Sequence, residues 1–140
     1  MPRADFYLID KPRFREDPLL LVCELVRKAF ASEQPTVILA RSQDQAEAID
    51  ARLWDFSDDA FIPHQIAGDE DDAITAVLIV PPGIDADERP LAINLRDGCA
   101  LGRHERVLEV VAAEPAEREG SRKRWKEYQQ RGYALSKHDM

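Results

Sequence analysis

TVILARSQDQAEAIDARLW, residues 36–54, joins a β-branched apolar run to an amphipathic segment. The run at 36–41 predicts a buried strand, because β-branched side chains pack well on a pleated sheet. Ser42, followed three residues later by Gln45, forms a capping box and predicts that a helix begins there. Three apolar residues then recur at helical spacing and are expected to face inward: Ala46, Ile49 and Leu53. The stretch therefore predicts one strand–helix unit of a parallel α/β sheet.

A similar unit precedes this stretch. DFYLID at 5–10 predicts a buried strand, and Asp17 with Pro18 is typical of a helix start. The helix expected over about 18–32 carries five apolar residues at helical spacing: Leu19, Val22, Cys23, Val26 and Phe30. Strand, helix, strand, helix in this order is typical of a right-handed parallel crossover.

The second half of the chain adds strands and one more helix. Three apolar runs predict strands, at 76–80, 91–95 and 106–112. FIPHQIAG contains Pro63, which restricts it to an edge strand or an ordered loop. The last helix is expected to begin near Pro115 and to stop at Gly132. We therefore expect one domain over residues 1–140, a small three-layer Rossmann-like α/β domain whose mostly parallel sheet of about five strands is flanked by helices.

Composition excludes several classes of function. The chain has 44% hydrophobic and 33% charged residues, which is typical of a globular domain. It has no apolar signal core at its amino terminus and no apolar run near the ~20 residues that span a bilayer, so we expect a cytoplasmic protein without membrane contact. The net charge of −8 opposes non-specific binding of nucleic acid.

Motifs of catalysis and cofactor binding are missing from the sequence. The segment after the first predicted strand, DKPRFRED, contains neither GxGxxG nor GxxxxGK[ST], and no GxSxG occurs. The two cysteines and three histidines match no metal-ligand spacing, and Cys23 is expected to be a buried apolar residue. We therefore expect no catalytic residues, no metal and no cofactor.

Basic residues gather in SRKRWKEYQQRGY, residues 121–133. This segment holds five basic residues and one acid, whereas the rest of the chain holds 14 basic and 26 acidic residues. Four residues lie within one arc of the predicted helix: Arg118, Arg122, Trp125 and Lys126. A helix-dipole effect reaches only the terminal turn, and a solvated charged face does not explain the tryptophan. The arc suits a ligand with both carboxylates and an apolar group.

A second candidate surface combines Trp54 with Phe61, Ile62 and Pro63. Trp54 lies one residue beyond the inward-facing Leu53, at the edge of the buried helix face. The sequence does not decide whether these residues close the core or anchor an interface. His64 follows the proline, and a hydrogen-bonded structural or interface histidine is favoured over a general base.

In these motifs the chain resembles the chi subunit of bacterial DNA polymerase III holoenzyme. The resemblance rests on FYLID, LVCEL, ID-x-x-LW at 49–54, FIPHQIAGD at 61–69 and the final RxRWKxYxxRGY. It implies a non-catalytic accessory subunit with a Rossmann-like fold that binds no nucleotide. It also implies a psi subunit partner, an indirect link to the clamp loader, and binding of the acidic, phenylalanine-ended tail of single-stranded DNA-binding protein.

The resemblance assigns residues to both contacts. The tail site falls on Arg118, Arg122, Trp125 and Lys126, and the psi interface falls on Trp54, Phe61, Pro63 and His64. Two other functions stay open at this point. The first is a nucleotide-binding Rossmann-like enzyme, and the second is a direct binder of single-stranded DNA, which aromatic residues among cations can support.

Overall fold

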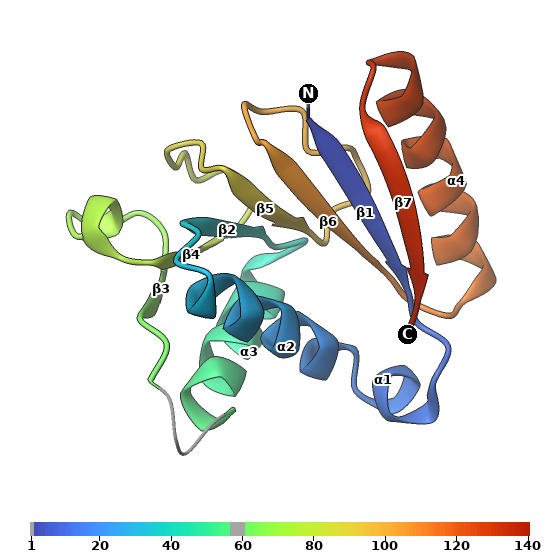
Figure 1. Ribbon diagram of the computed structural model, residues 1–140. Helices are drawn as coiled ribbons and strands as arrows, with labels where there is room; N and C mark the ends of the chain where they lie inside the picture. The colour runs from blue at the N-terminus through green and yellow to red at the C-terminus, as the bar shows by residue number, and fades with distance from the viewer. Residues whose placement is uncertain (1, 57–60) are drawn as a thin grey trace.

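The computed structural model describes residues 2–56 and 61–140, and they form three layers around a single sheet (Figure 1). The elements are β1 (Arg3–Leu8), α1 (Pro12–Glu16), α2 (Pro18–Ala31), β2 (Thr36–Leu39), α3 (Gln43–Asp55), β3 (His64–Ile66), a 3₁₀ turn (Asp72–Ile74), β4 (Val77–Val80), β5 (Leu91–Asn94), β6 (Arg106–Val111), α4 (Pro115–Gln130) and β7 (Ala134–Asp139). The strand order is β3-β4-β2-β5-β6-β1-β7, and every neighbouring pair is parallel. The prediction of a Rossmann-like α/β fold is confirmed, with seven strands instead of about five.

The helices pack on the two faces of this sheet. α2 and α3 form one apolar core with residues of the central strands, including Ile38, Ile79 and Ile93. α4 forms a second core on the opposite face, where Tyr128 packs with Phe6 of β1. None of the helices in the described part of the chain is long and apolar enough to cross a membrane.

The capping box begins α3 as predicted. The Ser42 side chain accepts a hydrogen bond from the backbone N–H of Gln45 at 3.0 Å, and the Gln45 side chain accepts one from the N–H of Arg41 at 2.6 Å. The two side chains thus satisfy backbone donors at the start of the helix. The residues predicted to face inward, Ala46, Ile49 and Leu53, are all buried.

Two elements, α1 and β7, differ from the sequence prediction, and a third settles an alternative that the sequence left open. β3 is the edge strand that the proline-containing segment allowed. A short helix that the sequence analysis did not predict, α1, follows β1, with Pro12 at its first position and Phe14 buried. β7 was missed, because its sequence ALSKHD is polar and its residues are exposed or partly buried. An edge strand of this kind needs only its backbone pairing with β1 and therefore shows no apolar alternation.

A buried polar network attaches α4 to the sheet. Arg124 donates from Nε to Oε1 of Glu109 on β6 at 2.9 Å, and both side chains are buried. The hydroxyl of Tyr128 and the amide of Asn94 donate to Oε2 of Glu109 at 2.6 and 2.7 Å. Arg124 therefore does not belong to the basic surface in which the sequence places it. Its charge is used inside the fold.

This network predicts that Arg124 is required for stability. Replacing Arg124 with Met leaves the Glu109 carboxylate buried without its cation and should lower the free energy of unfolding by about 3–5 kcal/mol. The matched control is Arg122→Met on the same helix, where the side chain is exposed and the free energy should hardly change. Urea denaturation of both variants measures the difference. Equal stability of the two would contradict a structural role for the Arg124–Glu109 pair.

Candidate functional site

The four residues predicted for the basic arc lie around one pocket of about 610 Å³. The pocket lies between α4 and the β1–β7 edge of the sheet, which stand beside each other in Figure 1. Its lining comprises Arg118, Ser121, Arg122, Trp125 and Lys126 of α4, Phe6 and Leu8 of β1, and Lys137 and Asp139 of β7. We call this the α4 pocket. It brings four cations together with a single carboxylate.

Aromatic packing forms the apolar wall of the α4 pocket. The ring of Trp125 meets the buried ring of Phe6 edge-on, with centroids 5.2 Å apart. Phe6 in turn packs against Tyr128, whose centroid is 6.0 Å away. Edge-to-face contacts of this kind fix the orientation of the rings. Packing therefore fixes the orientation of the Trp125 ring, which is partly exposed and forms an apolar surface in the pocket.

The cations of the α4 pocket are not equally free. The guanidinium of Arg118 donates to the carbonyl oxygen of Ile9, which holds it near the carboxyl end of β1. Arg122 and Lys126 are exposed, and neither forms an ion pair with another described residue. These two side chains are available to bind carboxylates of a ligand.

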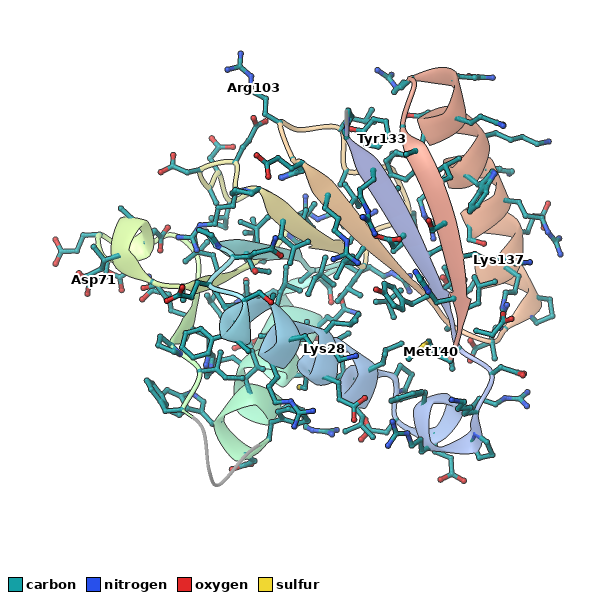
Figure 2. All side chains as sticks on the ribbon, viewed as in Figure 1. Lys28, Asp71, Arg103, Tyr133, Lys137 and Met140 are labelled. Carbon is teal, nitrogen blue, oxygen red and sulfur yellow. The ribbon has the colours of Figure 1, made fainter. Side chains whose placement is uncertain are left out.

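Sequence reasoning missed the contribution of the strands to the α4 pocket. Lys137 stands opposite Phe6 in the register of β7 with β1, and Asp139 stands opposite Leu8. Figure 2 labels Lys137 on β7, next to α4. No local signal in ALSKHD identifies these residues. Only the pairing of the last strand with the first brings them to the helix.

The second candidate surface is exposed. Trp54 is 57% exposed and Phe61 is 63% exposed, and their ring centroids are 5.3 Å apart. Pro63 is partly buried, whereas the neighbouring Ile62 is buried in the core. Trp54 and Phe61 therefore do not close the core.

His64 lies behind these aromatic rings in a structural position. Its Nδ1 is 2.7 Å from the carbonyl oxygen of Ile62, and its Nε2 is 3.3 Å from Oδ1 of Asp50 on α3. Its ring centroid is 4.9 Å from that of Trp54. The buried histidine is hydrogen-bonded, as expected, and it supports the ring of Trp54 from within.

Rossmann-like proteins hold nucleotides at the carboxyl ends of their strands. In this chain, acidic side chains at the start of α4 lie at that end of the sheet. A pocket of about 470 Å³ lies there, and its lining includes Arg41, Glu114 and Glu117. The Arg41 guanidinium is 3.2 Å from the Glu117 carboxylate and 3.7 Å from that of Asp97, so its charge is already balanced. Carboxylates at this helix terminus oppose the approach of a phosphate.

The two cysteines, Cys23 and Cys99, are free thiols that are buried and partly buried, respectively. Burial raises the pKa of both Cys23 and Cys99 to about 11, so both are protonated thiols at neutral pH. Within residues 2–56 and 61–140, no three His, Cys, Asp or Glu side chains are grouped to hold a metal ion.

Comparison with known proteins gives one consistent family. The family model described as "DNA polymerase III chi subunit, HolC" matches residues 1–136. DNA polymerase III subunit chi of Pseudomonas aeruginosa is 35% identical over 146 residues, covering 100% of this chain and 98% of the relative. The subunit chi of Escherichia coli is 28% identical over 142 residues and covers 97% of each chain.

A solved structure shares the fold at much lower identity. The C-terminal domain of the DEAD-box protein Dbp5 superposes with a TM-score of 0.63 at 12% identity, covering 99% of this chain and 90% of that domain. At this identity the likeness shows the α/β architecture alone. Whether the carboxyl edge of the sheet binds a nucleotide has to follow from the residues present there.

The carboxylates of Glu114 and Glu117 at the start of α4 predict that ATP and NAD do not bind. A ligand that binds only the folded state raises Tm in a saturable manner. Because Glu114 and Glu117 lie at the amino end of α4 and repel a phosphate group there, millimolar ATP or NAD should leave Tm unchanged relative to the same concentration of inorganic triphosphate. A saturable rise in Tm with either nucleotide, absent with triphosphate, would contradict this reading of the site.

Proposed function

Because the chain belongs to the DNA polymerase III chi subunit family, we propose that it is an accessory subunit without catalytic residues of its own. It binds the acidic tail of single-stranded DNA-binding protein and pairs with a psi subunit, both in the cytoplasm. The psi subunit would connect it indirectly to the clamp loader. One observation carries the proposal. The α4 pocket combines exposed cations with an apolar wall, on a chain whose net charge is −8.

The chemistry of the α4 pocket fits a peptide that ends in an apolar residue and carries carboxylates before it. Arg122 and Lys126 bind the carboxylates through charge-assisted hydrogen bonds, which are about twice as strong as neutral ones. Trp125 and the aliphatic stem of Arg118 contact the terminal phenylalanine. Because the net charge of the chain is −8, the surface outside this pocket is acidic overall and repels the tail.

The same geometry disfavours direct binding of single-stranded DNA. Stacking of bases needs aromatic faces that are open to solvent. Tyr128 is fully buried, and Trp125 and Tyr133 are partly buried against the sheet. One short group of cations on an acidic chain does not provide the continuous positive groove that a nucleic acid backbone requires.

The exposed rings of Trp54 and Phe61 are the proposed anchors of the psi subunit, with Pro63 beside them and His64 behind. Exposed aromatic residues that pack on one another at the surface are typical of residues that dominate binding energy in an interface. This surface lies at the β3 edge of the sheet, whereas the α4 pocket lies at the β7 edge. A psi subunit and the tail can therefore bind at the same time.

The first prediction concerns Arg122. A charge-assisted hydrogen bond contributes ~1.5–3 kcal/mol, so Arg122→Ala should weaken binding of a tail peptide by about ten- to a hundredfold in isothermal titration calorimetry. The matched control is Arg131→Ala, which removes an exposed cation of the same helix region that pairs with Glu127 and lies outside the α4 pocket. A peptide without its terminal phenylalanine should also bind weakly. Equal affinity of the wild type and Arg122→Ala would refute this site.

The second prediction concerns Phe61. Phe61→Asp should abolish co-purification with a psi subunit and leave Tm nearly unchanged, because the side chain is 63% exposed. The control is Ile62→Asp, which should unfold the chain, because Ile62 is only 2% exposed. The psi assignment is wrong if Phe61→Asp retains the partner or unfolds as Ile62→Asp does.

A further inference from the structure

The free edge of β7 presents regularly spaced backbone groups that have no partner strand. In the parallel ladder with β1, Ala134 donates its N–H to Pro2, Met140 donates to Leu8, and Asp10 donates to Met140. In a parallel pair, one residue directs both of its backbone groups to the same neighbour, and the next residue directs both away. The even-numbered residues of β7 therefore pair with β1. The N–H and C=O groups of Leu135, Lys137 and Asp139 point outward.

These outward backbone groups adjoin the α4 pocket. The side chains of Lys137 and Asp139 line that pocket, so the backbone of the same residues lies at its border. α4 packs on the sheet face formed by β6 and β1, so the α4 pocket lies on that face, beside the edge strand β7. Within the described residues, no other segment forms a hydrogen bond with these three backbone positions.

We propose that the acidic peptide bound in the α4 pocket extends along β7 as an eighth strand, parallel to it, and forms hydrogen bonds with the backbone of Leu135, Lys137 and Asp139. This inference rests on the proposed function and adds the mode of recognition. The direction follows from the position of the pocket. The pocket lies at the carboxyl end of β7, and the C-terminal residue of the peptide is seated in it. The preceding residues of the peptide then run back along β7 toward Leu135, so the peptide has the same direction as β7.

The added strand places the peptide's carboxylates among the cations. Side chains of a strand alternate between the two faces of a sheet. Every second side chain of the peptide therefore points to the face that carries α4, as the side chain of Lys137 does. Lys126 and Arg122 follow one another along α4 next to that row. The free stretch from Leu135 to Asp139 spans about 13 Å at ~3.3 Å per residue, enough for a peptide segment of about five residues.

A second copy of the chain is the alternative occupant of an open strand edge. Charge argues against it, because two copies would bring two sets of Arg118, Arg122, Lys126 and Lys137 toward each other. A lysine in the middle of an edge strand is a common device against pairing between identical edges. An acidic peptide has the opposite charge and neutralises the same group.

The test uses a tail peptide with a single N-methyl group moved along its backbone. N-methylation removes one N–H, so only the positions that donate to β7 should lose affinity. We expect a loss of about three- to tenfold at alternate residues and little change at the residues between them, measured by calorimetry on the full chain. A uniform response along the peptide would overturn the added strand.

Substitutions at Lys137 test the same contact from the protein. Lys137→Ala removes the side chain and keeps the N–H, whereas Lys137→Pro removes both. An edge strand tolerates proline where the N–H points outward, so both variants should fold, and Lys137→Pro should bind the peptide about three- to tenfold more weakly than Lys137→Ala. His138→Pro should instead destabilise the fold, because its N–H faces β1.

The outcomes separate the two proposals. If the unmodified peptide does not bind, or binds Arg122→Ala equally well, the proposed function and the added strand fail together. If it binds with the expected sensitivity to Arg122→Ala, but N-methylation shows no alternation or the two Lys137 variants bind equally, only the added strand fails. A dimer of the free chain in sedimentation equilibrium, lost in Lys137→Pro, would also overturn it by assigning the edge to a second copy.

Discussion

The buried ion pair between Arg124 and Glu109 determines how α4 lies on the sheet. α4 buries only Ser121, Arg124 and Tyr128, so it has no continuous apolar stripe to fix its rotation. The carboxylate of Glu109 instead receives donors from Arg124 and Tyr128, one helical turn apart. Burial raises the pKa of Glu109, and the Arg124 guanidinium opposes that effect by favouring the charged form. With Arg124 directed inward, the arc that begins at Arg118 is turned toward β1 and β7.

This arrangement explains how an acidic chain keeps a basic site. One cation of the 121–133 segment, Arg124, is neutralised inside the fold, whereas Arg122 and Lys126 lie beside Trp125 in the α4 pocket. The order of the strands then separates the two proposed interfaces, since β3 and β7 are the opposite edges of the sheet. A chain with this arrangement can contact one protein at each edge of its sheet, as the proposed function requires.

The sequence predicted the strand–helix units because their apolar periodicity and capping signals are local. It also placed the four residues of the arc on one helix face, and the α4 pocket brings them together. It did not predict β7 or the part of Lys137 in the pocket, because an exposed edge strand is specified by backbone pairing with a strand more than a hundred residues away. It also did not separate Arg124 from the other basic residues of the 121–133 segment, since nothing local distinguishes an arginine paired with a buried Glu109 from an exposed one.

The central claim is that the acidic tail binds at the α4 pocket and not at the other aromatic surface. The chain has two tryptophans, and each surface holds one of them. Their indole N–H groups give two separate signals in an amide correlation NMR spectrum, so one titration with a tail peptide observes both surfaces in the same sample. Binding at the α4 pocket predicts that the Trp125 indole signal shifts with saturation while the Trp54 signal stays in place. A shift of Trp54 alone, or of neither signal at saturating peptide, would contradict it.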